Sequence, residues 1–237
     1  MHGCGYVHSM YAGGMVDGPG IRYVVFLAGC PLRCKYCHNP DTWNEKNGTL
    51  KTVEEVVSEI LKYKKYYTFS KGGVSVSGGE PLHQPDFVAA LLAACKTHNL
   101  HTVLDTSGFA GIEDAEKALA HTDLLLLDIK SINPEVFKKL CGVELDKTLE
   151  VLRLSRRLKI QTRIRFVLVP GYTDNINDIQ KMAEYLRDFD NIEKVDVLPF
   201  HKTGEYKWKN LGLHYELTET QPPSPELLQE VQRILTL

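Results

Sequence analysis

The chain has 237 residues, which is enough for one large α/β domain or two small ones with a buried core. Its 28 basic and 30 acidic side chains give a formal net charge of −2, so no overall charge favours nucleic acid or an anionic membrane as a partner. No apolar run approaches a membrane span, and the first Lys or Arg is Arg22, which argues against a secretory signal; we expect a cytoplasmic protein with reduced thiols.

The N-terminal region is rich in glycine, and we predict that residues 1–15 form an irregular arm. The sequence DGPG at residues 17–20 is a strong turn signal. Residues 22–28 are a short apolar run typical of a strand buried on both faces, and we predict the first strand there. This strand leads into a loop with Cys30, Cys34 and Cys37, so half of the chain's six cysteines fall within eight residues.

Three thiolates this close together in a short loop are suited to holding a metal ion or an iron-sulfur cluster. A four-iron cluster usually takes four cysteines, and the next one is Cys95, so one iron would lack a protein ligand and be open to chemistry. The alternative is a closed structural zinc site that uses the three sulfurs and a nitrogen of His38. A disulfide fits less well, because three clustered thiols leave one unpaired.

The rest of the chain alternates between predicted strands and helices. Thr52 to Glu55 fits a capping box ahead of a helix over residues 53–61, and Pro85 is expected to open another helix with Cys95 buried near its end. Further strands are predicted at residues 74–76, 101–105, 124–128, 162–169 and 195–198. Further helices are predicted at residues 112–120, 177–187 and 225–235, and helical segments are predicted over residues 134–158.

Six strands that alternate with helices imply right-handed crossovers and a parallel sheet. A closed eight-stranded barrel normally needs about 250 residues, so we expect an incomplete barrel or an open doubly wound sheet. We find no repeat and no linker, and we expect one domain. It would have an arm to residue 20, a core over residues 21–201 and an extension over residues 202–237 that could cover the site or bind a partner.

Polar or glycine-rich residues follow nearly every predicted strand. They are Cys30 after the first strand, and then Gly78-Gly79-Glu80-Pro81, Asp105-Thr106-Ser107-Gly108, Asp128-Ile129-Lys130, Arg165 with Val169-Pro170-Gly171, and Pro199-Phe200-His201. The carboxyl ends of parallel strands converge on one rim, so we expect these residues to share a site. Taken alone, each of these residues has an ordinary structural explanation. Together they favour a catalytic site, because a structural zinc site would not by itself require polar residues along this rim.

The GGEP sequence at residues 78–81 also carries information about a ligand. Glycines lack a Cβ atom, so the backbone can approach a ligand closely there. Pro81 restricts Glu80 to an extended conformation. A fixed carboxylate beside bare backbone suits a small cationic amine.

The CxxxCxxC pattern of the three cysteines, followed by GGEP, resembles the radical S-adenosylmethionine superfamily. Four more segments are similar to the activating enzymes of pyruvate formate-lyase in that superfamily: residues 17–22, 36–43, 169–171 and 198–201. Those enzymes have partial six-stranded barrels. The resemblance therefore implies an α/β fold with a partial (β/α)6 TIM-like barrel of parallel strands.

The resemblance also implies roles for single residues. Cys30, Cys34 and Cys37 would hold one [4Fe–4S] cluster, whose open iron would bind S-adenosylmethionine. The cofactor contacts would come from Tyr36, Cys37, His38, Gly78, Gly79, Glu80, Asp128, Ile129, Lys130, Arg165 and His201. The positions of Asp105, Thr106 and Asp128 help to hold a monovalent cation in this family. Asp17 would lie on the loop that meets the protein substrate.

The activity that the resemblance implies is reductive cleavage of S-adenosylmethionine, which yields methionine and a 5′-deoxyadenosyl radical. That radical would take a hydrogen atom from a glycine of pyruvate formate-lyase. Sibling activases often carry extra cysteines ahead of GGEP, and residues 38–77 contain none, which favours this partner and a single cluster. The chain would act as a monomer, and flavodoxin or ferredoxin would supply the electron.

Two alternatives stay open at this point. Within enzymes, the chain could activate a different glycyl radical protein. From a different class, it could be a zinc-stapled binding module. Of the cysteines outside the motif, we read Cys4 as a thiol on the mobile arm, and Cys141, next to Gly142, as packing at a helix end.

Overall fold

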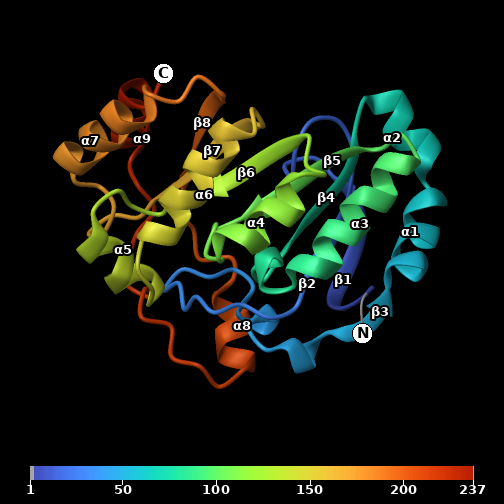
Figure 1. The fold of residues 1–237 in the computed structure, drawn as a ribbon. Coiled ribbons are helices and arrows are strands. Elements are labelled where there is room, and N and C mark those ends of the chain that lie inside the picture. The colour runs from blue at the N-terminus through green and yellow to red at the C-terminus, as the bar shows by residue number, and fades with distance from the viewer. Residues whose placement is uncertain (1–2, 237) are drawn as a thin grey trace.

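The computed structural model describes residues 3–236, which form one eight-stranded sheet with helices packed on it (Figure 1). The strand order is β3-β1-β2-β4-β5-β6-β7-β8. The strands are β1 Cys4–Gly14, β2 Arg22–Leu27, β3 Thr49–Thr52, β4 Gly73–Gly78, β5 His101–Thr106, β6 Leu124–Asp128, β7 Gln161–Leu168 and β8 Ile192–Pro199. The helices are α1 Val53–Leu61, α2 Lys64–Ser70, α3 Pro85–Thr97, α4 Ile112–Leu119, α5 Pro134–Cys141, α6 Asp146–Arg157, α7 Ile176–Leu186, α8 Glu205–Asn210 and α9 Pro225–Ile234.

The six predicted strands are confirmed as β2 and β4 to β8, and each pairs in parallel with its neighbours in this run. The sheet is open, because among residues 3–236 the edge strands β3 and β8 do not pair with each other. The predicted helices are confirmed as well, including the capping box in which Thr52 and Glu55 bond reciprocally at the start of α1. None of the helices in the described part of the chain is long and apolar enough to cross a membrane.

The prediction of an irregular arm over residues 1–15 is wrong for Cys4–Gly14, which forms β1. This strand lies antiparallel to both β2 and β3 and extends the sheet beyond the six parallel strands. Residues 1–2 lie outside the described residues. Cys4 is accordingly not a thiol on a mobile arm, because it pairs opposite Thr52 in the sheet. Glycines and polar residues hide the strand signal of β1, so that only its neighbours specify it.

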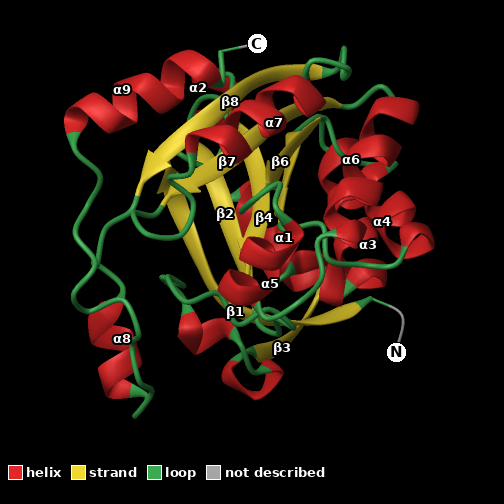
Figure 2. Cartoon of the chain, turned by 90° about the vertical axis from the view of Figure 1, so that its left-hand side faces the viewer, coloured by secondary structure: helices red, strands yellow, loops and turns green. Residues whose placement is uncertain are grey.

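One face of the sheet carries most of the helices and the apolar core. Figure 1 shows α3, α4 and α6 side by side across this face, where α3 packs against α4 and α4 against α6. At the other end of the sheet α9 packs on α7 and β8. Figure 2 shows α8 set apart from the sheet at the end of long loops. The core is built from buried apolar residues of the strands and of these outer helices.

The opposite face of β7 and β8 carries charged side chains at alternate positions. In β7 the residues Thr162, Ile164 and Phe166 are buried, whereas Arg163 and Arg165 between them are partly exposed. Alternate side chains of a strand point to opposite faces, so the arginines face away from the helices. This face is where a ligand can reach the sheet.

Candidate active site

A cavity of about 760 Å³ lies along the face of the sheet that carries Arg163 and Arg165, and it brings the predicted rim residues together. Thirteen of the predicted site residues line it: Cys30, Cys34, Tyr36, Cys37, His38, Gly78, Gly79, Asp105, Thr106, Asp128, Lys130, Arg165 and His201. Three others do not line it, namely Asp17, Glu80 and Ile129. The volume is within the range of small-molecule sites.

The cysteine loop is held in place by backbone hydrogen bonds on both sides. The N–H groups of Arg33 and Lys35 donate to the last residues of α5, with 2.8 Å from Arg33 N to the Cys141 oxygen. The indole Nε1 of Trp208 in α8 donates to the Cys37 carbonyl at 2.8 Å. The loop is thus fixed by α5 and by a helix that lies far along the chain. Cys141 is fully buried at the end of α5, as its position before Gly142 predicts.

Two of the three thiols, those of Cys30 and Cys37, lie in surroundings that disfavour free thiolates. Burial raises the pKa of Cys30 and raises that of Cys37 to about 12. A hydrogen bond with the Cys141 thiol lowers the pKa of Cys34. Buried thiols ionise when a metal centre beside them displaces their protons. The loop therefore suits a positively charged centre.

The spacing of the side chains bears on the two metal sites that the sequence leaves open. Among residues 3–236, no three His, Cys, Asp or Glu side chains are grouped closely enough to hold one metal ion. A zinc ion needs its ligands within about 2.0–2.3 Å of one point. In a four-iron cluster, by contrast, each thiolate binds a separate iron. A cluster therefore does not need its three thiolates within reach of one ion.

Two aromatic groups near the cysteines have polar atoms that a ligand can use. The Tyr36 hydroxyl is buried and has no hydrogen-bond partner in the part of the chain that the structure describes. Burial raises the pKa of Tyr36, so the phenol stays neutral and can donate. The His38 ring lies 4.3 Å from that of His201 and its Nε2 donates to the His201 carbonyl at 3.1 Å. Burial lowers the pKa of His38, which leaves Nδ1 of the neutral ring as an acceptor.

Two ion pairs stand near the carboxyl ends of β5 and β6, and one of them uses Arg165 from the middle of β7. Lys130 Nζ lies 2.8 Å from Asp128 Oδ2, and Arg165 Nη1 lies 3.0 Å from Asp105 Oδ2. Arg165 also approaches Asp128, at 3.9 Å, and the nearby carboxylate of Asp105 raises its pKa. The cluster of charges is neutral in sum and presents both signs. It therefore matches a zwitterion such as the amino and carboxylate ends of an amino acid.

The two glycines of GGEP meet backbone in this structure. A Cβ atom on Gly78, whose φ is +117°, would lie 2.2 Å from Leu27 N, and one on Gly79 would lie 2.4 Å from the Gly29 oxygen. The backbone of residues 27–29 approaches so closely that both positions require glycine, whether or not a ligand also binds there. The extended conformation predicted for Glu80 is confirmed, with φ −125° and ψ 108°.

The Glu80 carboxylate is fully buried and accepts four hydrogen bonds. Its donors are the backbone N–H groups of Leu82 and Ser107, both at 2.9 Å, and the hydroxyls of Thr106 and Ser107. The side chain therefore ties the end of β4 to the end of β5 underneath the cavity. Ile129 is likewise fully buried, and Asp17 lies on the loop before β2, where burial raises its pKa.

Several cavity residues were missed by the sequence analysis. Among them Ser77, Arg163, Lys194 and Asp196 line the cavity, and Ser77 Oγ donates to Asp105 at 2.7 Å. The two-residue period of a strand could have predicted such residues. Arg163, for example, lies two positions before Arg165 in β7 and therefore on the same face of the sheet. Arg163, Lys194 and Asp196 extend the cavity along β7 and β8.

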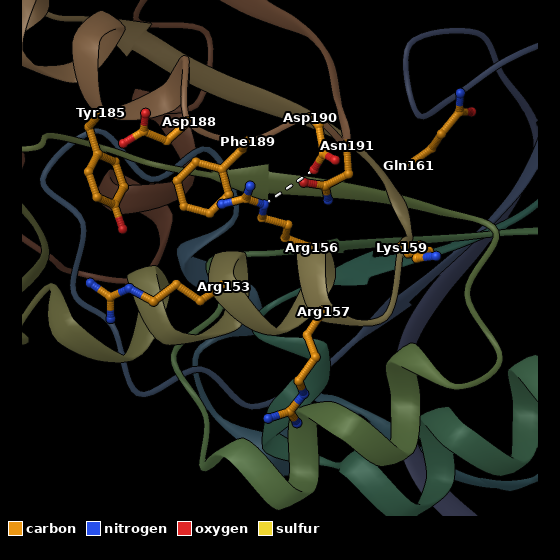
Figure 3. Close-up of a pocket in the computed structure, with 10 residues that line it drawn as sticks. All are labelled: Arg153, Arg156, Arg157, Lys159, Gln161, Tyr185, Asp188, Phe189, Asp190 and Asn191. Carbon is orange, nitrogen blue, oxygen red and sulfur yellow. Dashed lines mark hydrogen bonds and ion pairs between the residues drawn. The ribbon is translucent and has the colours of Figure 1, made fainter.

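A second cavity, of about 890 Å³, lies by α6 and the connection from α7 to β8 (Figure 3). Its lining includes Arg153, Arg157 and Tyr185, and the ion pair drawn in Figure 3 joins Arg156 to Asp190 at 3.2 Å. It lies near the amino ends of β7 and β8, opposite the rim. It has no cysteine in its lining and none of the predicted site residues, so it does not replace the first cavity as the candidate site.

Comparisons with known sequences agree with this geometry. A family model described as the radical SAM superfamily matches residues 24–186. The pyruvate formate-lyase 1-activating enzyme of Escherichia coli (strain K12) is 40% identical over 233 residues, which cover 98% of this chain and 95% of that protein. The pyruvate formate-lyase-activating enzyme of Staphylococcus aureus (strain USA300) is 45% identical over 238 residues, which cover 97% of this chain and 94% of that protein.

Comparisons with solved structures give related folds. A domain of pyruvate-formate lyase-activating enzyme from Bacteroides vulgatus ATCC 8482 matches with a TM-score of 0.58 and 28% identity, over 69% of this chain and 92% of that one. QueE from Escherichia coli matches with a TM-score of 0.56 and 15% identity, over 89% and 92% of the two chains. The second likeness concerns the fold alone.

Proposed function

This chain belongs to the radical SAM superfamily and, within it, to the pyruvate formate-lyase-activating enzymes, and on that premise we propose that it installs a glycyl radical in pyruvate formate-lyase. The observation that carries the proposal is the single cavity in which the three motif cysteines meet the charged rim. The reaction makes the chain an oxidoreductase that acts on another enzyme. The related activity on a different glycyl radical protein is the alternative that uses the same cavity.

In this proposal Cys30, Cys34 and Cys37 hold a [4Fe–4S] cluster, and one iron stays open for S-adenosylmethionine. When bound and reduced, the cluster supplies the electron that cleaves the bond between sulfur and C5′, which gives methionine and the 5′-deoxyadenosyl radical. The chain itself contributes the thiolate ligands, the orientation of the cofactor and the exclusion of competing hydrogen donors. The partner's glycine would then give one hydrogen atom from its Cα to that radical, which would leave as 5′-deoxyadenosine.

The charged rim orients the amino acid end of S-adenosylmethionine. Lys130 and Arg165 face its carboxylate, and Asp128 together with the backbone at residues 78–79 faces its amino group. Tyr36 donates its unpartnered hydroxyl, and the paired rings of His38 and His201 flank the ribose and adenine side of the cavity. In this arrangement Glu80 acts underneath the cavity by fixing Thr106 and Ser107, and Ile129 packs behind the rim.

We assign Asp105, Thr106 and Asp128 to a monovalent cation beside the cofactor carboxylate. Asp105 and Asp128 lie on either side of Arg165, and the Thr106 hydroxyl is already engaged by Glu80 and Gly108. We predict that replacing potassium with tetramethylammonium raises the KM of S-adenosylmethionine about five-fold, because the rim loses a charge that the carboxylate uses. Steady-state 5′-deoxyadenosine formation measures this. An unchanged KM in both salts would remove the cation from the site.

The protein substrate reaches the cavity from the side of the loop over residues 15–18, which contributes Met15, Val16 and Gly18 to the lining. Asp17 lies within this loop. We predict that Asp17→Ala retains cleavage of S-adenosylmethionine without partner but lowers glycyl radical formation about ten-fold or more, because the changed residue lies on the loop that would meet the partner. Quantified 5′-deoxyadenosine and the glycyl radical signal give the two rates. Equal loss of both would contradict the role of the loop.

The electron donor in this proposal is flavodoxin or ferredoxin, and the chain acts as a monomer. Arg33 and Lys139 are exposed cations beside the cysteine loop, since α5 bonds directly to that loop. Exposed positive charge near the cluster favours docking of an acidic redox protein.

The experiment that tests the proposed function is incubation of the reconstituted, reduced protein with S-adenosylmethionine and purified pyruvate formate-lyase. The expected result is a glycyl radical doublet on the partner in electron paramagnetic resonance, with 5′-deoxyadenosine formed in step. Parallel incubations with other glycyl radical proteins serve as comparison. A doublet on one of those and none on pyruvate formate-lyase would assign the chain to the different partner.

A further inference from the structure

Arg22 is a fully buried arginine that the chemistry described so far does not use. It is the first residue of β2 and lies below the loop over residues 15–20. Its guanidinium donates to the carbonyl oxygens of Val74 and His101, the latter at 3.1 Å, and approaches that of Pro19 at 3.4 Å. Burial lowers its pKa to about 10, so it stays charged at neutral pH. Burying a charge costs free energy unless hydrogen bonds compensate for it. The hydrogen-bond partners of Arg22 therefore indicate which segments it holds in place.

The Ser75 hydroxyl connects Arg22 to the loop. Arg22 Nε donates to Ser75 Oγ at 3.0 Å, and Ser75 Oγ donates to the Asp17 carbonyl oxygen at 2.6 Å. The direction of both bonds is fixed, because a guanidinium can only donate and a carbonyl can only accept. A hydrogen-bond relay therefore runs from the buried charge through the middle of β4 to the backbone of Asp17.

The loop is shaped to rest on this support. Gly18 has φ +134°, and a Cβ atom there would lie 3.4 Å from Arg22 Nε. Gly20 has φ +64°, and a Cβ atom there would lie 2.4 Å from the Ser70 carbonyl oxygen. Both are in the left-handed region that favours glycine. The backbone of the loop therefore lies directly against Arg22 and the end of α2.

On its outer side, the same loop presents apolar side chains to the cavity. Met15 is 79% exposed and Val16 is 83% exposed, although both line the cavity. Side chains this exposed have no packing of their own to fix their positions. The position of the loop is therefore set from below, by its backbone contacts.

We propose that Arg22, acting through the Ser75 hydroxyl, is a positioning residue that holds the loop over residues 15–20 ready to receive the glycine-bearing segment of the partner. This inference rests on the proposed function. Arg22 touches neither the cofactor cavity nor the reacting atoms. Its effect is on partner binding and on coupling, meaning the number of glycyl radicals formed per S-adenosylmethionine cleaved.

The test is Ser75→Ala, which removes one hydroxyl and leaves Arg22 its carbonyl acceptors. We expect the KM for pyruvate formate-lyase to rise about ten-fold and coupling to fall, with kcat and uncoupled cleavage within about two-fold of the wild type. The matched control is Ser155→Ala in α6, a fully buried serine whose hydroxyl bonds the Leu152 carbonyl at 2.8 Å. Ser155→Ala should leave the KM for pyruvate formate-lyase and the coupling unchanged.

The possible outcomes distinguish failure of the positioning role from failure of the proposed function. A wild-type KM and wild-type coupling in Ser75→Ala would overturn the positioning role while the wild type still activates its partner. Parallel loss of coupled and uncoupled activity in Ser75→Ala, with Ser155→Ala unaffected, would place the residue in the cofactor cavity or the fold and would also overturn it. A wild type that cleaves S-adenosylmethionine but forms no radical on pyruvate formate-lyase would overturn the proposed function, and this inference with it.

Discussion

Cys34→Ala is expected to lose its iron and to lower the cleavage of S-adenosylmethionine by more than about 100-fold, since even the residues that merely support metal ligands cost up to that factor. Cys34 is one of the three thiols that line the cavity. Its position is fixed because the neighbouring residues 33 and 35 donate backbone hydrogen bonds to α5. Among residues 3–236, no other thiol lines the cavity, and the Cys141 thiol, which bonds Cys34, lies behind the lining. Iron content and 5′-deoxyadenosine yield after anaerobic reconstitution measure the loss.

The matched control for this variant is Cys95→Ala. Cys95 is fully buried among the apolar residues of α3, as the sequence predicts, and it lies outside the cavity. It should keep the wild-type iron content and activity, although its stability will fall somewhat because a cavity is left. Full iron content and cleavage in Cys34→Ala would exclude Cys34 as a ligand.

Glu80→Ala is expected to destabilise the fold by about 3–5 kcal/mol, because four donors lose their acceptor in a buried site. The unpaired groups would be the N–H groups of Leu82 and Ser107 and the hydroxyls of Thr106 and Ser107. Urea unfolding monitored by circular dichroism gives the free energy of unfolding. A loss below about 1 kcal/mol would contradict the role that we give to this carboxylate.

Glu80→Gln separates that supporting role from direct contact with the cofactor. Gln keeps one oxygen as an acceptor, so we expect a smaller loss of about 1–2 kcal/mol. Because Glu80 lies outside the cavity, the affinity for S-adenosylmethionine in Glu80→Gln should stay within about three-fold of the wild type. A folded Glu80→Gln that loses most of its affinity would instead show that the carboxylate itself receives the amino group of the cofactor.

The six parallel strands and their helices were predictable because each carries its own local signal. The buried run of β6, Leu124–Asp128, is apolar in four of its five positions, and Thr52 marks the start of α1. β8 extends to Ile192–Pro199, beyond the predicted residues 195–198, because Glu193 and Lys194 mask its start. β1 escaped prediction because antiparallel pairing with β2 and β3, and not its own sequence, makes it a strand.

The location of the site was predictable from one rule, that the carboxyl ends of parallel strands meet. This rule brought Cys30, Asp105 and Asp128 together correctly, although they lie far apart in the sequence. Contacts between side chains of different loops could not be predicted in this way. The enclosure of Glu80 and the relay from Arg22 to Asp17 depend on distances that only the folded chain sets.

The central claim is that three cysteines hold a cluster whose open iron binds S-adenosylmethionine. Electron paramagnetic resonance of the anaerobically reconstituted, reduced protein, with and without S-adenosylmethionine, tests it most directly. We predict a cluster signal that the cofactor changes in shape and position. A protein that binds one zinc per chain and gives no cluster signal after reconstitution would contradict the claim.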